Sequence, residues 1–218
     1  MITNPSILRR SQERILLTTL FGGFLAFLAL PRVQSTPGLF WSVVGWGLVA
    51  VVSFLALQWR DRSHGHTSTI EVRIRRPHYV QSAIQAAIFA YWGYHWTTVY
   101  RELPLILSQI LFAYVVEYLI CRFKYGNWRL GFGPIPIVLS TNLFLWFHDP
   151  YFGWQYAMVL LAFGSREFIR WNREGRDVHV FNPSAFALCV IALVLILGEW
   201  PHHTYGQQIS INLGRPEF

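Results

Sequence analysis

The chain of 218 residues is 53% hydrophobic and 17% aromatic, and only 13% of its residues are charged. A soluble domain carries about 25% charged residues, so this composition argues against an ordinary soluble protein and favours a membrane protein. The net charge of +7 does not indicate nucleic-acid binding, because the arginines lie beside apolar segments, where they act as topological anchors. The two cysteines form no spaced motif, which argues against a disulfide framework or a zinc site.

Seven apolar segments follow one another along the chain. A helix needs about 20 residues to cross a hydrocarbon core of about 30 Å, and the second, third, fourth and seventh segments satisfy that requirement. The sixth segment gains length if its helix continues to Trp171. The sequence therefore predicts an all-α, polytopic integral membrane protein with about seven transmembrane helices. In chain order the segments are Ile15–Leu30, Leu39–Trp59, Val80–Tyr100, Leu103–Cys121, Ile135–Phe147, Phe152–Phe163 and Pro183–Trp200.

No linker divides the chain, so residues 1–218 are expected to form a single transmembrane domain. The abrupt ending at Arg215–Phe218 leaves a C-terminal truncation open. Nothing at the N-terminus is typical of a cleavable signal peptide, because Pro31-Arg32-Val33 is not a small-residue cleavage site.

Fifteen of the eighteen Lys and Arg residues fall into four polar stretches, and two apolar segments separate each stretch from the next. Positive charge beside a membrane span is retained in the cytoplasm. The stretches are therefore expected on the cytoplasmic side of a bacterial inner membrane, together with the N-terminus. Within the second stretch, the alternation of apolar and polar residues in Ile70–Arg75 predicts a short strand on that side. The four stretches comprise residues 9–14, 60–76, 122–129 and 166–176.

The fifth segment begins with a run rich in glycine and proline, Gly131–Pro136. Proline removes backbone donors and glycine favours turns, so this run predicts a non-helical start to a broken or re-entrant helix. Irregular backbone at membrane depth is tolerated only where protein or a water-filled cavity satisfies it. We therefore place Gly133 and Asn142 on a candidate ion path. Hydrogen bonding between helices is an equal alternative for Asn142.

Two other polar residues lie at the ends of apolar segments. Glu117 is one turn from the cytoplasmic end of the fourth segment, where a salt bridge to Arg122 or Lys124 competes with a role on the ion path. His95, near the outer end of the third segment, is a candidate cofactor ligand that could pair with His148. Histidine is equally ordinary among interfacial aromatic residues. No metal site is expected.

Asn182 opens the seventh segment directly before Pro183. Asparagine before a proline at the first helical position is typical of a helix N-cap, which is the structural interpretation of this residue. The functional interpretation is that Asn182 and Ser184, at the positive end of the helix, face a bound anion, a flavin or an ion path.

The string Phe181-Asn182-Pro183-Ser184-Ala185 is similar to the Asn-Pro-Phe-Asn-Pro-Ala signature of the RnfD/NqrB family, membrane subunits of ion-translocating electron-transport complexes. The resemblance extends over roughly residues 70 to 200 and points to the UnbU-like branch of the family. It implies a membrane subunit of an electron-transfer or ion-coupled complex, with other membrane subunits as partners. Further motifs that carry it are Arg76–Gln81, Leu130–Pro134 with Ser140–Asn142, and Arg166–Trp171.

Family members with covalent flavin attach FMN through a threonine in a Ser/Asp-Gly-Ala/Val-Thr-like segment, and this chain has no such segment. Covalent FMN is therefore not expected, whereas noncovalent flavin is compatible with the resemblance. No phosphate-binding glycine loop, nucleophile elbow or HExxH occurs, so no catalytic residue is assigned. The chain is at most a redox-carrying subunit of an oxidoreductase complex. The alternatives are a noncatalytic accessory or scaffold subunit of a respiratory or photosynthetic complex, and a stand-alone transporter.

Overall fold

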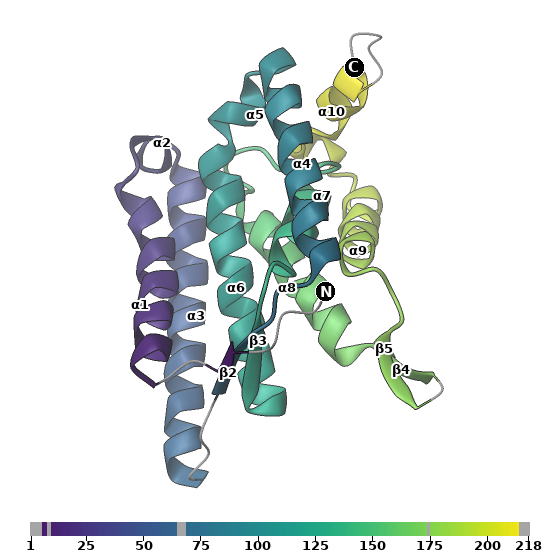
Figure 1. Cartoon of the computed structure of the whole chain (residues 1–218). Coiled ribbons are helices and arrows are strands. Elements are labelled where there is room, and N and C mark those ends of the chain that lie inside the picture. The colour runs from purple at the N-terminus through teal and green to yellow at the C-terminus, as the bar shows by residue number, and fades with distance from the viewer. Residues whose placement is uncertain (1–5, 8–9, 65–68, 174, 214–218) are drawn as a thin grey trace.

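Helices dominate the computed structural model, which describes residues 6–7, 10–64, 69–173 and 175–213 (Figure 1). Arg9 of the first basic stretch and the chain end from Arg215 to Phe218 lie outside the described residues. Each predicted apolar segment overlaps one main helix: α1 (Arg10–Ala26), α3 (Pro37–His64), α4 (Arg76–His95), α6 (Leu103–Tyr125), α7 (Pro134–Asn142), α8 (Gly153–Phe168) and α9 (Pro183–Leu197). Three shorter helices are α2 (Pro31–Gln34), α5 (Thr98–Arg101) and α10 (Gly206–Leu213), and the third segment also reaches α5.

Proline and glycine define several helix boundaries. Pro37, Pro134 and Pro183 are the first residues of α3, α7 and α9. The first amides of a helix have no intrahelical acceptor, so a proline there loses no hydrogen bond and its fixed φ favours the helical turn. At the other end of α6, Gly126 adopts a left-handed conformation with φ of +70° and terminates the helix.

Helix α6 lies inside the bundle and packs against α1, α3, α7 and α8. Its buried Phe112 contacts Phe24 of α1 and Tyr156 of α8, with ring centroids 5.6 and 5.4 Å apart. The Tyr156 hydroxyl also lies 2.6 Å from that of Ser108. These contacts fix the rotation of α6 against α8, which matters for the polar residues at the ends of both helices.

Among the described residues, three helical stretches are long and apolar enough to cross a membrane: Gln12–Ala29, Pro37–Ser63 and Leu103–Tyr125. Helix α9 is apolar but has only 15 residues. The prediction of a mostly helical membrane protein is thus confirmed, whereas the seven crossings stay a prediction.

Two small sheets lie at one end of the bundle, which we call the basic end (Figure 1). The first joins β1 (Ser6–Ile7), β2 (Thr69–Val72) and β3 (Asn127–Leu130), with β2 and β3 parallel; the second is the hairpin of β4 (Arg170–Arg173) and β5 (Arg176–His179). Strand β2 confirms the predicted strand, although it ends at Val72. Helices α2, α5 and α10 lie at the opposite end of the bundle (Figure 1).

Helix α7 is shorter and begins earlier than the sequence predicted. Only residues 131–133 are non-helical, and Pro134 and Pro136 lie in the first helical turn, where their missing amides cost no hydrogen bond. The helix ends at Asn142, so the rest of the predicted segment to Phe147 is irregular. Pro134 and Pro136 are buried, whereas Phe132 is exposed, so the burial predicted for Gly131–Pro136 holds for only part of the run.

Helix α8 ends at Phe168 and does not continue to Trp171, so that part of the prediction was wrong. Residues from Arg170 onward form β4, in which Trp171 is the register partner of Val178 in β5. Helical periodicity alone did not reveal this competing pairing, because the partner strand follows a turn at Gly175, where φ is +74°.

Candidate functional site

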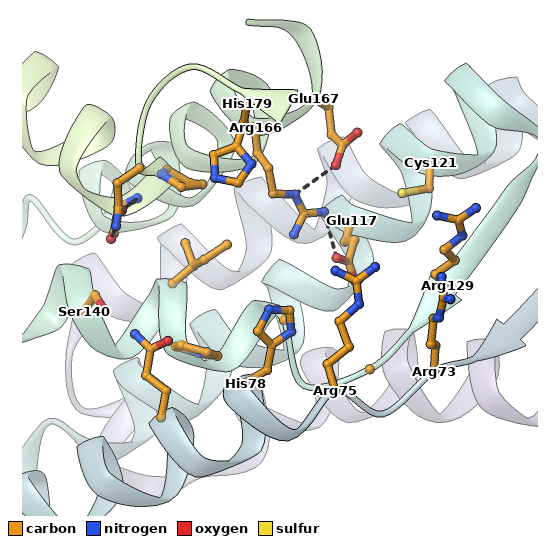
Figure 2. A pocket seen from close by; sticks show the side chains of 18 of the residues that line it. Arg73, Arg75, His78, Glu117, Cys121, Arg129, Ser140, Arg166, Glu167 and His179 are labelled. Atoms are coloured by element: carbon orange, nitrogen blue, oxygen red, sulfur yellow. Dashed lines mark hydrogen bonds and ion pairs between the residues drawn. The ribbon is translucent and has the colours of Figure 1, made fainter. Parts of the chain in front are cut away.

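A cavity of about 770 Å³ opens at the basic end, between the start of α4, the start of α7, the start of α9 and the final turns of α6 and α8 (Figure 2). Each of the three helix starts contributes a residue to the wall: His78 from α4, Gly133 before α7 and Asn182 before α9. The start of a helix carries a partial positive charge, although prolines at all three starts remove first-turn amides and Asn182 accepts from two of those in α9. The volume lies in the range typical of small-ligand sites. Three helix starts therefore favour a negatively charged occupant.

The charged side chains of the wall have the same bias. Two glutamates, Glu117 and Glu167, face five arginines, which come from the β2–α4 connection, from β3, from α8 and from β4. Guanidinium groups offer planar, multiple donors that match phosphate and carboxylate oxygens. The arginines are Arg73, Arg75, Arg129, Arg166 and Arg170.

Arg166 connects the two glutamates (Figure 2). Its Nη2 donates to Glu117 Oε1 at 2.7 Å, and its Nε donates to Glu167 Oε1 at 2.9 Å. The second oxygen of Glu117 accepts a hydrogen bond from Trp128 Nε1 at 3.0 Å. Arg166 is thus a structural link between α6 and α8 as well as part of the cavity wall.

The salt bridge expected at Glu117 therefore exists, but with a different partner. Arg122 lies five residues further along α6, which turns it about 140° away from Glu117, and it pairs with Asp61 of α3 at 2.7 Å. Lys124 donates to the backbone carbonyl of Glu167. The partner of Glu117 comes from α8, 49 residues away in sequence.

Arg73 and Arg75 differ from the other arginines, because no carboxylate among the described residues pairs with them. The Nε atom of Arg73 is buried without a hydrogen-bond partner. Gly131 permits this arrangement, since a Cβ at that position would lie 2.5 Å from the carbonyl oxygen of Arg73. Arg129, by contrast, lies 3.6 Å from Glu71. Among the described side chains, the positive charges of Arg73 and Arg75 are therefore uncompensated.

The positive charges of the cavity wall affect the protonation of His78. Burial lowers the pKa of its imidazole below the usual value, and the positive charges of Arg75 and Arg166 lower that pKa further. A neutral His78 at pH 7 can both donate and accept a hydrogen bond in the cavity.

Asn182 caps α9, as its structural interpretation predicted. Its Oδ1 accepts from the amides of Ser184 and Ala185 at 3.1 and 3.3 Å and from the Ser184 hydroxyl at 2.7 Å. Both Asn182 and Ser184 nevertheless line the cavity. Asn182 and Ser184 therefore belong both to the helix cap and to the cavity wall.

Asn142 lies elsewhere, in a buried hydrogen-bond network. Its Nδ2 donates to Gln109 of α6 and to the Val138 carbonyl, both at 2.8 Å, while its Oδ1 accepts from Gln155 of α8 at 2.9 Å. The side chain is fully buried. This geometry favours the helix-to-helix alternative over an ion path for Asn142.

His95 is also remote from the cavity wall. Its ring contacts Tyr91 and Tyr94, with centroids 4.8 and 5.2 Å apart. Within the residues that the structure describes, no three His, Cys, Asp or Glu side chains are grouped as a metal site would require. The structure thus brings together Glu117, Gly133, Asn182 and Ser184, and separates Asn142 and His95 from them.

The five arginines of the wall were interpreted from the sequence only as markers of topology. One signal did point to them: all five belong to three of the basic stretches, and motifs of the family resemblance overlap two of those stretches and directly follow the third. Their convergence depends on the parallel pairing of β2 with β3, which places Glu71 opposite Arg129, and on the packing of α6 against α8.

No protein-family model, curated protein or solved structure matches this chain.

Proposed function

We propose that the chain crosses a bacterial inner membrane seven times, with its N-terminus and its basic end in the cytoplasm. The collection of basic stretches at one end of the bundle supports this orientation. In this arrangement α7, with nine residues, covers about 14 Å, roughly half of the hydrocarbon core. Such a half-helix requires burial by its neighbours, and α4, α6, α8 and α9 supply it.

We further propose that the protein is a membrane subunit of an electron-transfer or ion-coupled complex related to the RnfD/NqrB family, and that it binds a phosphate-bearing flavin noncovalently in the basic cavity. The observation that carries this proposal is the meeting of five arginines with three helix starts. Arg73 and Arg75 have the donors and the charge that a phosphate requires. A bound flavin supplies one- and two-electron redox chemistry there.

We expect the protein to recognise the flavin mainly through its phosphate group. Arg166 is held by two glutamates and orders the inner wall, whereas Arg73 and Arg75 keep their charge available. Gly133 keeps the inner space open: a Cβ built on it would lie 3.6 Å from His78 Nδ1 and 3.9 Å from Arg166 Nη1. A larger side chain there therefore enters the cavity.

A noncatalytic accessory subunit is the second candidate. The buried hydrogen bonds of Asn142 favour it, because both its amide nitrogen and its amide oxygen are already bonded to neighbouring helices, as is typical of helix packing. In that role the basic cavity contacts a partner subunit and not a small ligand.

Titration of the purified protein with FMN and with riboflavin, followed by flavin fluorescence, separates the two candidates. We expect FMN to bind at least 10-fold more tightly than riboflavin, because a charge-assisted hydrogen bond contributes about 1.5–3 kcal/mol. Arg73→Gln combined with Arg75→Gln, and separately Gly133→Leu, should weaken FMN binding. Arg62→Gln, an exposed arginine outside the cavity wall, is the matched control. Absence of FMN binding by a folded protein contradicts the flavin proposal and favours the accessory role.

A further inference from the structure

A second cavity, of about 480 Å³, lies between α3, α6 and α8 and is separate from the basic cavity in its lining residues. Its wall is almost entirely apolar. Val49, Ala56 and Leu57 of α3 face Leu119 and Phe123 of α6 and Leu160 of α8. We call this cavity the lateral groove.

The lateral groove lies at a depth where lipid is the surrounding medium. Its two principal walls, α3 and α6, contain two of the three stretches that are long and apolar enough to cross a membrane. Apolar side chains remain exposed along it, with Val49 52% and Phe123 56% exposed. An apolar hollow open to hydrocarbon fits an acyl chain.

The end of the lateral groove nearest the basic end carries positive charge. Arg60, which lines the groove, and Arg122 share the single carboxylate of Asp61, at 3.0 and 2.7 Å. Two guanidinium groups therefore meet at this one carboxylate. Lys124 adds a positive charge at the same end, because its hydrogen-bond acceptor is a neutral backbone carbonyl of Glu167.

Both charges adjoin aromatic rings of the groove. The Arg60 guanidinium carbon lies 5.2 Å from the ring centroid of Phe123, and the Lys124 ammonium lies 5.4 Å from that of Phe168. Phe123 and Phe168 both line the groove. The cations are therefore positioned where a chain lying in the groove reaches its headgroup.

We propose that the lateral groove binds one anionic phospholipid, with an acyl chain between α3, α6 and α8 and the headgroup phosphate beside Arg60 and Lys124. The bulk bilayer is as apolar as the groove, so chain burial alone gives little preference over bulk lipid. The charges decide the selectivity, each contributing about fivefold in favour of an anionic headgroup. This inference does not depend on flavin binding in the basic cavity.

Native mass spectrometry can test the proposal on the full chain, released from vesicles of equimolar phosphatidylglycerol and phosphatidylcholine with identical acyl chains. We expect one retained lipid, mainly phosphatidylglycerol. Val49→Trp should abolish retention by filling the groove. Val52→Trp is the matched control, because Val52 lies on the same helix, is 63% exposed and does not line the groove. Ala56→Phe repeats the filling test if Val49→Trp does not fold.

The charge variants test the other half of the proposal. Lys124→Gln, and Arg60→Gln, should each lower the preference for phosphatidylglycerol about fivefold while a lipid is still retained. Arg62→Gln should leave the preference unchanged. Equal retention of the two lipids by the wild type overturns the proposal. A preference for phosphatidylglycerol that persists when the groove is filled also overturns it. If Arg73→Gln/Arg75→Gln abolishes the preference while Lys124→Gln does not change it, the headgroup binds in the basic cavity instead.

Discussion

Arg166 of α8 and Glu117 of α6 form an ion pair at 2.7 Å that links two helices in the wall of the basic cavity. Their side chains are only 18% and 7% exposed. Glu167 and Trp128 complete the hydrogen bonding around the pair. A buried pair of this kind is costly to break, because the remaining charge loses its compensation.

Glu117→Gln should lower the free energy of unfolding by about 1.5–3 kcal/mol, since one hydrogen bond to a charged group is weakened while Arg166 keeps Glu167. Thermal unfolding in detergent, followed by tryptophan fluorescence, measures the change. Glu71→Gln is the control, because its partner Arg129 is 59% exposed and 3.6 Å away; such surface pairs contribute about 0–1 kcal/mol. Equal effects of the two substitutions would contradict the structural importance of the Glu117 pair.

Asn182 combines a cap with a position in the cavity wall, and substitutions can separate the two roles. Asn182→Ala should cost about 1 kcal/mol of stability through loss of the cap, whereas Asn182→Asp and Asn182→Ser should retain it. Asn182→Asp also places a negative charge in the cavity. We therefore expect Asn182→Asp to weaken FMN binding and Asn182→Ser to preserve it. Unchanged FMN binding in a stable Asn182→Asp protein argues for a purely structural role.

His78 predicts a pH dependence of anion binding in the basic cavity. Because its pKa lies below the usual value, the imidazole gains its positive charge only when the pH falls below about 6.5. Sulfate affinity, measured calorimetrically, should therefore rise as the pH falls through that range, since sulfate itself keeps its charge. His78→Gln should flatten this rise. His179 also lines the cavity, so His179→Gln measures its separate share; an unchanged profile in His78→Gln rejects the assignment.

Labelling of single cysteines tests the proposed topology. Ser63 lies at the basic end of α3, and Asn172 lies in the β4–β5 hairpin. Cysteines at these two positions should react only with reagent on the cytoplasmic side. A cysteine at Thr204, near the opposite end, should react only from outside, after denaturation has confirmed that the buried position is labelled at all. Labelling of Ser63→Cys and Thr204→Cys from the same side contradicts seven crossings.

The candidate site was only partly predictable. The Asn-Pro string placed Asn182 and Ser184 at a helix start, and the glycine-rich run marked Gly133. All three residues line the basic cavity. The arginines could not be assigned, because arginine beside an apolar segment has the same sequence pattern whether it faces lipid headgroups or a cavity. Asn142 was ambiguous for a similar reason: a buried amide can serve a path or a neighbouring helix, and only the positions of Gln109 and Gln155 distinguish them.

The sequence by itself determined the helical character, the approximate positions of the helices and the sorting of positive charge, because hydropathy, proline and charge act locally along the chain. Tertiary structure decided which residues meet. The rotation of α6 turns Glu117 toward Arg166 and Arg122 toward Asp61, and rotation about a helix axis is fixed by packing against neighbours. The β2–β3 pairing likewise brings Arg73 to Gly131, where carbonyl and glycine touch. The basic cavity exists because these long-range contacts converge.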